Sequence, residues 1–316
     1  MRSAAVAIFA YRRPNHLRKL LQSLSENYGV EEFEVYLFID GPRTEIDFEL
    51  IQKVTLTAED FSNELNLHVL SSPVNLGLAT SIRSNVSKLF EQYDTLIVLE
   101  DDLIVSKYFL LFMSNGLRAF AEDQSIAAIS GYSYPISDLI EGGYILPGGD
   151  CWGWATWKDR WEAVNWDAVK LNAELKNSGR IISFNLNGEY DYFGMLVDSE
   201  LGLIDSWAIY WHTSMFLSSK YTYYPNQTLV LNTGMDQSGT HFNSKSKGFD
   251  VQNVLHDSVA EIQLSDLQDR SKDLSALYRR VNDSNLSILT YKIYRGMRRL
   301  KRRIYRKFSY LGQSSL

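Results

Sequence analysis

The stretch Asp94–Val105 reads DTLIVLEDDLIV. Its first part, Thr95 to Leu99, is apolar or β-branched, a composition typical of a buried β-strand. Three acids follow at once: Glu100, Asp101 and Asp102. Adjacent carboxylates repel one another, and burying them unpaired costs free energy. Either these acids lie in water as a loop, or a cation belongs beside them.

Outward from this stretch, the N-terminal half alternates short apolar runs with helical patterns. Such alternation predicts βαβ units, and therefore an α/β fold with a central, mainly parallel sheet flanked by helices. Strands are expected over 4–10, 33–40, 65–72, 94–99 and 125–130. Helices are expected over 14–27 and 75–93, where leucine, isoleucine, valine and phenylalanine recur at helical spacing.

The second half has a different composition. Glycine and tryptophan concentrate in GGDCWGWATWKDRW, and tyrosine is frequent between Tyr190 and Tyr224. We interpret residues 142–248 as loops and helices that cover one end of the sheet, where an acceptor could be held. Trp154, Trp157 and Trp161 fall at helical spacing, which favours core packing over a platform for sugars.

Acidic residues follow two of the expected strands. In doubly wound sheets ligands bind outside the carboxyl ends of the strands. Asp40, in FIDGP, and the three acids of EDD both fall at such ends. Hard oxygen ligands suit Mg²⁺ or Mn²⁺, ions that commonly bind substrate phosphates as well. The sequence predicts a site for a divalent cation and a polyhydroxylated ligand, although Asp40 in DGP also suits a plain turn.

The charge is distributed unevenly along the 316 residues. The net charge is −6, yet nine lysines and arginines lie between Lys292 and Lys307 and no acid follows Asp283. An acidic body argues against nucleic acid as a partner. We predict a helical, basic, amphipathic tail over 264–316, because the apolar residues of 286–311 step by three or four. This pattern suits an anionic membrane surface, and packing on the acidic body or on a partner subunit is the alternative.

Four segments together resemble a known family. They are AIFAYRRPNHLRKLLQSL, LFIDG, NLGLATSIRSN and VLEDDLIVSKYFL, with a weaker match in WGWATWKDRW. In order and spacing they are similar to GT-A fold glycosyltransferases, both the bacterial family 2 enzymes and the N-acetylglucosaminyltransferase I type. The resemblance implies a Rossmann-like nucleotide-diphospho-sugar transferase domain over 1–263. Its nucleotide-sugar half would cover 1–130 and its acceptor half 131–263.

The resemblance also implies roles for the acids. EDD corresponds to the family's DXD-like motif, so Asp102 would hold the Mn²⁺ or Mg²⁺ ion that bridges the donor diphosphate. Asp101 would hydrogen-bond the ribose or the transferred sugar, and Glu100 would approach the sugar. Asp40 would contact the base or ribose of the nucleotide.

Three further residues are candidates for donor binding. By the same resemblance, Arg13 would lie near the nucleotide or pyrophosphate, and Arg83 would contact the donor from its helix. His241 lies in the segment MDQSGTHFNSKSKG, which is rich in glycine and serine. We predict that His241 reaches the diphosphate or metal from a loop that orders when the donor binds.

Transfer with inversion needs a general base near the acceptor hydroxyl. We predict that Asp205, in LIDSWAIYW, is this base, with Trp207 and Trp211 nearby for sugar stacking. The similar N-acetylglucosaminyltransferase segment has Asp-Asp-Trp where this sequence has Asp205-Ser206-Trp207, so one acid is missing. Asp198 and Glu200 are the reserve candidates. The remaining histidines share no spacing typical of metal ligands, so we interpret them as structural: His16, His68, His212 and His256.

The resemblance implies an enzyme that moves a hexosyl or N-acetylhexosaminyl group from a nucleoside-diphosphate sugar to a glycan or lipid-linked acceptor. Bacterial surface polysaccharide synthesis is the expected setting. The lone Cys151 and the absence of an apolar run of membrane-spanning length favour a cytoplasmic protein, attached peripherally to the inner face of the plasma membrane. The alternatives are an inactive glycan-binding or scaffold protein and a nucleotide-sugar nucleotidyltransferase. A nucleotidyltransferase would need a glycine-rich loop after the first strand, and AYRRPNH has no glycine.

Overall fold

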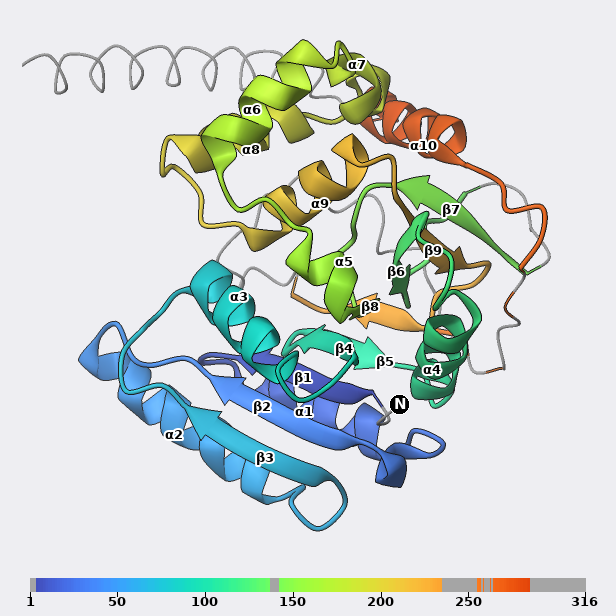
Figure 1. Ribbon diagram of the computed structural model, residues 1–316. Helices are drawn as coiled ribbons and strands as arrows, with labels where there is room; N and C mark the ends of the chain where they lie inside the picture. The colour runs from blue at the N-terminus through green and yellow to red at the C-terminus, as the bar shows by residue number, and fades with distance from the viewer. Residues whose placement is uncertain are drawn as a thin grey trace, which may run out of the picture.

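The computed structural model describes residues 4–136, 142–234, 255–256, 258, 262 and 264–284. Their centre is an eight-stranded sheet with the order β3-β2-β1-β4-β8-β6-β9-β7 (Figure 1). Its strands are β1 (Ala5–Ala10), β2 (Glu34–Ile39), β3 (Asn66–Ser71), β4 (Thr95–Glu100), β6 (Ile126–Ser130), β7 (Gly143–Pro147), β8 (Trp154–Trp157) and β9 (Tyr221–Pro225). A second, two-stranded sheet pairs β5 (Leu103–Val105) with β10 (Val230–Asn232).

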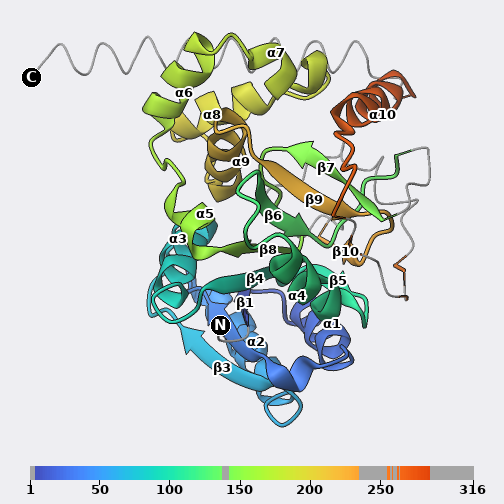
Figure 2. The same ribbon diagram turned by 45° about the vertical axis from the view of Figure 1, so that its right-hand side comes forward.

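Helices cover both faces of the large sheet. They are α1 (Pro14–Ser25), α2 (Glu45–Glu59), α3 (Leu78–Leu89), α4 (Phe109–Ala119), α5 (Lys158–Glu162), α6 (Ala168–Asn177), α7 (Ile181–Phe184), α8 (Tyr192–Glu200), α9 (Trp207–Leu217) and α10 (Ser271–Ser284), with 3₁₀ turns at Val30–Glu32 and Leu186–Gly188. Figures 1 and 2 both place α6 and α7 at the end of the molecule opposite α2 and β3.

The expected α/β class with a mainly parallel sheet is confirmed. Strands β3, β2, β1 and β4 run parallel to one another, as do β6 and β9, so four of the seven pairings in the described sheet are parallel. Strand β1 lies between β2 and β4. The chain therefore leaves β1 toward one side and later returns on the other, which creates a switch point between β1 and β4.

The first helix shows why the sequence pattern succeeded there. Pro14 occupies the first turn of α1, where its missing N–H would have had no partner within the helix. Leu17, Leu20, Leu21 and Leu24 are all fully buried. The helix therefore packs its leucine face on the sheet. This packing fixes the segment that connects the carboxyl end of β1 to α1.

Two hydrophobic cores lie on the two faces of the sheet. One packs α1, α2 and α4 against β1, β2 and β4. The other packs α3 and α9 against the opposite face, with Trp154, Trp161, Trp207 and Trp211 at its centre. A third, smaller cluster joins α6, α7, α8 and α9. The two central cores fix β4 between α1 and α3 with both of its faces buried.

The prediction for the second half is wrong in one respect. Residues 142–234 contribute strands as well as helices and loops, namely β7, β8, β9 and β10. Strand β8 runs antiparallel between β4 and β6. Trp154 and Trp157 are the ends of β8 and not helical, although both are buried, as is Trp161. A spacing of three matches one helical turn, and no local pattern indicates that the segment pairs with β4.

Part of the segment predicted as a separate tail packs on the main body. Leu274 and Leu277 of α10 are buried in a cluster with Tyr144, Leu146 and Tyr224 of β7 and β9, and Figure 2 shows α10 on this side of the molecule. The apolar stripe of 286–311 and His241 lie outside the described residues. No helix within the described part of the chain has both the length and the apolar character needed to span a bilayer.

Candidate active site

The three acids lie at the switch point between β1 and β4. Glu100 is the last residue of β4, and Asp101 prolongs the pairing because its backbone N–H donates to Phe9 O at 3.0 Å. The side chain of Asp101 is 3% exposed and that of Asp102 is 15% exposed. The acids therefore do not form a solvated loop, the first of the two alternatives that the sequence left open.

The nearest cation to these acids is Arg13, which follows β1. Its guanidinium forms ion pairs with Asp101 and, at 3.0 Å from Nη1 to Oδ2, with Asp102. Burial lowers the pKa of Arg13, but the charges of Asp101 and Asp102 outweigh it and raise that pKa above its ordinary value. Arg13 thus lies in the acid cluster itself, with one guanidinium shared by two carboxylates.

One positive charge does not balance three carboxylates. Burial raises the pKa of Glu100 and the charges of Asp102 and Asp101 raise it further, whereas the charge of Arg13 and a hydrogen bond from the Trp207 indole act against both effects. Burial also raises the pKa of Asp101, with Arg13 acting against it. Ionised Glu100 is therefore destabilised in this place, and a second cation would relieve the repulsion.

The donor set fits a hard divalent cation that completes its shell elsewhere. No group of three histidine, cysteine or acidic side chains with metal-binding geometry occurs among the described residues. Mg²⁺ and Mn²⁺, however, are commonly held by one or two carboxylates together with phosphate oxygens. Asp102 is partly accessible and lines a cavity, so its carboxylate can take that part.

The end of β10 closes over Asp102. The Thr233 N–H and hydroxyl donate to the Asp102 carbonyl oxygen at 2.7 and 2.8 Å. A Cβ atom on Gly234 would collide with the Asp102 carboxylate, so only glycine allows this approach. Sequence analysis singled out neither residue, because nothing local indicates that LNTG meets EDD.

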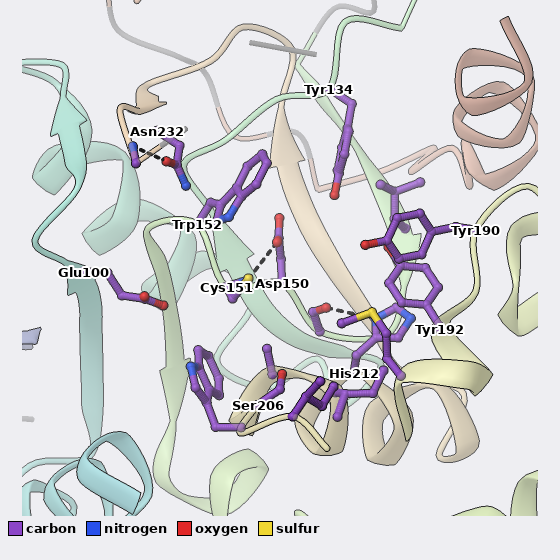
Figure 3. A pocket seen from close by; sticks show the side chains of 18 of the residues that line it. Glu100, Tyr134, Asp150, Cys151, Trp152, Tyr190, Tyr192, Ser206, His212 and Asn232 are labelled. Carbon is purple, nitrogen blue, oxygen red and sulfur yellow. Dashed lines mark hydrogen bonds between the residues drawn. The ribbon is translucent and has the colours of Figure 1, made fainter. Parts of the chain in front are cut away.

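A cavity of about 510 Å³ opens beside the acid cluster. Figure 3 shows Glu100 at one side of this cavity. Arg13, Glu100 and Asp102 line one part of it. Aromatic side chains line much of the rest; they are Tyr134, Trp152, Tyr190, Tyr192, Trp207, Tyr224 and Tyr278. The cavity therefore combines a charged end with an aromatic wall.

Asp150 is a buried acid in this cavity that sequence analysis missed. Its carboxylate accepts from Cys151 N at 2.7 Å and from the Ser130 hydroxyl at 3.1 Å. Burial raises its pKa, and these two hydrogen bonds with those from Tyr224 and the Trp152 backbone act against that rise. The signal was present in GGDCWGW, where an acid sits among glycine and tryptophan.

The two glycines before Asp150 let this loop pack on α9. A Cβ atom at Gly148, whose φ is +92°, would lie 2.5 Å from His212 Nδ1, and one at Gly149 would collide with the Trp211 indole. Gly149 O accepts from His212 Nδ1 at 3.0 Å. Burial lowers the pKa of His212 to about 4, so this ring is neutral at neutral pH.

The predicted base, Asp205, lines the cavity next to the start of α9. Its side chain is exposed, so the apolar residues beside it in the sequence do not bury it. A Cβ atom added to Gly77 would lie 2.7 Å from Asp205 Oδ2, which places this carboxylate against the start of α3. The reserve candidates are not among the cavity residues: Asp198 is buried, and Glu200 accepts a hydrogen bond from Asn172.

Two predicted donor-binding residues have other partners. The Asp40 carboxylate accepts three backbone N–H groups, from Gly41 at 2.9 Å, Leu76 at 2.8 Å and Gly77 at 3.0 Å. It thereby fixes the loop that leads from β3 into α3. The Arg83 guanidinium lies 4.6 Å from the centre of the Trp166 ring. Neither Asp40 nor Arg83 lines the cavity.

Comparisons with known proteins give distant similarities. No family model matches the chain. Among solved structures, S. aureus TarS 1–349 matches with a TM-score of 0.41 and 16% identity, over 73% of this chain and 60% of that one. The mannosyltransferase PcManGT from Pyrobaculum calidifontis, in complex with GDP-Man and Mn²⁺, matches with a TM-score of 0.36 and 14% identity, over 50% of this chain and 46% of that one. Likeness at this level assigns no function to the chain, so its function has to be argued from the chemistry of the site.

Proposed function

We propose that the chain is a glycosyltransferase that moves a sugar from a nucleoside diphosphate to an acceptor hydroxyl. One observation carries this proposal: three carboxylates and Arg13 meet at the β1–β4 switch point and face a cavity whose other wall is aromatic. A nucleoside diphosphate needs cations, and a sugar ring needs flat apolar faces with hydroxyl partners. Both requirements are met within one cavity.

The charged end suits a departing diphosphate. As the bond between sugar and phosphate breaks, negative charge grows on the leaving phosphate, and fixed cations stabilise that charge where it develops. Arg13 supplies one such cation, and Asp101 positions it. Asp102 would hold Mn²⁺ or Mg²⁺, which when bound neutralises the diphosphate as a Lewis acid. Glu100 then faces the sugar, hydrogen-bonded to Trp207.

Asp205 is the proposed general base. Its exposed carboxylate at the cavity edge can accept the proton of an acceptor hydroxyl, and transfer from the opposite face of the sugar inverts the anomeric centre. Asp40 would act on the nucleotide through the loop that it fixes, and Arg83 from the surface of α3.

A glycan or lipid-linked glycan acceptor in bacterial surface polysaccharide synthesis fits a cavity that holds sugar rings. Attachment to the inner face of the membrane would depend on 286–311, outside the described residues.

The test is a binding and transfer experiment with matched carboxylate-to-amide variants. Thermal unfolding is followed with nucleoside diphosphates, with and without Mn²⁺, and transfer is followed as release of nucleoside diphosphate from a panel of nucleotide sugars. Asp102→Asn is expected to abolish the manganese-dependent stabilisation. Asp205→Asn is expected to keep it and to lower transfer about 100- to 10,000-fold.

The matched control is Asp60→Asn, a change of the same kind on an exposed ion pair with Arg18. It is expected to alter neither quantity. Absence of any metal-dependent stabilisation by any nucleoside diphosphate would exclude the proposal, and the opposite pattern for Asp102 and Asp205 would reverse their roles.

A further inference from the structure

The aromatic wall is assembled from segments far apart in the chain. Trp152 precedes β8, Tyr190 and Tyr192 lie at the start of α8, and Tyr278 is on α10. The ring centres of Tyr190 and Tyr192 are 4.4 Å apart, and those of Tyr190 and Tyr278 are 5.2 Å apart. All four rings are partly accessible and line the cavity. Figure 3 shows Tyr190 and Tyr192 on the side of the cavity away from Glu100.

The hydroxyl groups of this wall are neutral. Burial raises the pKa of Tyr134, Tyr192 and Tyr278 well above the ordinary value, and the charge of Asp150 adds to the effect. A neutral phenol both donates and accepts one hydrogen bond, as a sugar hydroxyl does. The wall therefore offers flat apolar rings that carry polar groups suited to a polyol.

The charge at this end of the cavity is negative. The Asp150 carboxyl accepts hydrogen bonds from Cys151 N and Trp152 N, which can only donate, and these bonds favour its charged form against the rise in pKa that burial causes. Among the described residues that line the cavity, Arg13 is the one lysine or arginine, and it is paired with Asp101 and Asp102. His212, the histidine of the lining, is neutral at neutral pH. An anion placed here would meet Asp150, and none of the described residues that line this end would supply a cation to pair with it.

We infer that the aromatic end of the cavity, formed by Trp152, Tyr190, Tyr192 and Tyr278 around Asp150, is a subsite for an uncharged sugar unit of the acceptor and that it excludes sugars carrying a carboxylate. The inference deepens the proposed function, and it rests on that function in taking the bound sugar to be part of the acceptor. Stacking on the rings and hydrogen bonds with the phenols favour the neutral ring. Desolvating a second carboxylate beside Asp150 is costly because nothing compensates it.

The experiment uses saturation-transfer NMR on the full chain with matched pairs of disaccharides. One member of each pair is built from neutral hexoses or N-acetylhexosamines, and the other carries a hexuronic acid at the corresponding position. Several neutral disaccharides are expected to receive saturation, and their acidic partners are expected to bind about tenfold more weakly, as one uncompensated charge contact implies.

Two variants test the electrostatic cause. Met195→Lys places a cation in the lining on a side chain of similar length, and it is expected to raise binding of the acidic disaccharides about tenfold while leaving the neutral ones within about twofold. Asp150→Asn removes the carboxylate charge, and it should also reduce the difference in binding between the neutral and the acidic disaccharides. The matched control is Ile182→Lys, at a position on α7 that is 71% exposed. It should change the binding of neither the neutral nor the acidic disaccharides.

The outcomes separate the two proposals. If no neutral disaccharide binds, or if acidic partners bind equally well to the unaltered chain, the subsite inference is wrong even when nucleoside diphosphates bind. If sugars bind as expected but no nucleoside diphosphate does, the subsite stands as a glycan-binding site and the transferase proposal fails. Should Met195→Lys unfold the chain, Asp150→Asn and the unaltered chain still decide the matter.

Discussion

The buried carboxylates at this site need a positive charge beside them. Arg13 is shared between Asp101 and Asp102, and the Asp101 side chain is almost fully buried. Breaking a buried ion pair by removing one partner leaves an uncompensated charge, which costs more than the pair itself contributes. Arg13 is therefore a structural requirement of the acid cluster as well as a candidate for phosphate binding.

The first prediction concerns Arg13→Met, which keeps much of the side-chain volume. It is expected to lower the free energy of unfolding by about 3 kcal/mol at pH 7. Without Arg13 the pKa of Asp101 rises further above its unfolded value, so the carboxyl gains a proton and the loss shrinks as the pH falls toward 5. Urea denaturation at both pH values measures this.

The control for Arg13 is Arg18→Met, which removes an ion pair with Asp60 in which both side chains are more than half exposed. Its effect is expected to stay below about 1 kcal/mol. Equal losses for the two variants would show that Arg13 is not needed to compensate the acids.

A second prediction at this scale concerns His212. The pKa of this ring is 6.5 in the unfolded chain, and burial lowers it to about 4 in the folded chain. Between pH 4 and pH 6.5 the unfolded state therefore holds more protons than the folded state. Folding stability should therefore fall as the pH drops through this window, by about 3 kcal/mol from His212 alone. His212→Asn keeps a donor for Gly149 O and should lose this part of the pH dependence. Curves of unfolding free energy against pH that coincide for both proteins would contradict it.

Helices α3 and α9 approach each other closely at the site because a glycine there has no side chain. Gly77 precedes α3 with φ +76°, and the space where its Cβ would lie is next to the Asp205 carboxylate at the start of α9. The Asp40 carboxylate holds the same turn by accepting from Gly77 N. Helices from two halves of the chain are thus placed relative to each other by one backbone approach.

The third prediction concerns Gly77→Ala. Strain from a positive φ should lower the free energy of unfolding by about 1–2 kcal/mol. Displacement of Asp205 should lower transfer more strongly than it lowers nucleotide binding. Gly179→Ala is the matched control, because Gly179 has φ +68° and nothing within 4 Å of its added Cβ. Comparable loss of transfer in both variants would rule out an effect through Asp205.

At the scale of the whole molecule, the cavity is closed by chain that the sequence assigns to a tail. Leu274 of α10 is 4% exposed, and Tyr278 one turn later lines the cavity. Ile145 of β7 exchanges backbone hydrogen bonds with Gln268 and Arg270, which fixes the approach to α10. The body and this helix therefore form one folding unit over the described residues.

The fourth prediction follows from that packing. Leu274→Ala is expected to lower the free energy of unfolding by about 3 kcal/mol in a single cooperative transition. Lys272→Ala, an exposed change on the same helix, should have little effect. If the helix belonged to an independent tail, Leu274→Ala would leave the main transition in place, and urea denaturation distinguishes the two results.

The strands of the N-terminal part of the large sheet and the helices α1 and α3 were predictable because their signals are local, whereas α2, α4 and β5 were not predicted. Leucines at helical spacing define α1, and an apolar run that ends in EDD defines β4 and the charged end of the site. The antiparallel strand β8 was not predictable, since a short WATW segment fits a helical turn as well as a strand. The choice was made by pairing with β4 and β6, strands that lie far away in the sequence.

The sequence by itself determined the α/β class and the position of Glu100, Asp101 and Asp102 at a strand end. It could do so because hydrophobic periodicity is a property of consecutive residues and can be recognised without knowledge of distant contacts. Only the tertiary structure decided which cation compensates them, which rings face them and where α10 packs. Those features arise where segments tens of residues apart come within contact distance, and contact energies between such segments leave no local pattern in the chain.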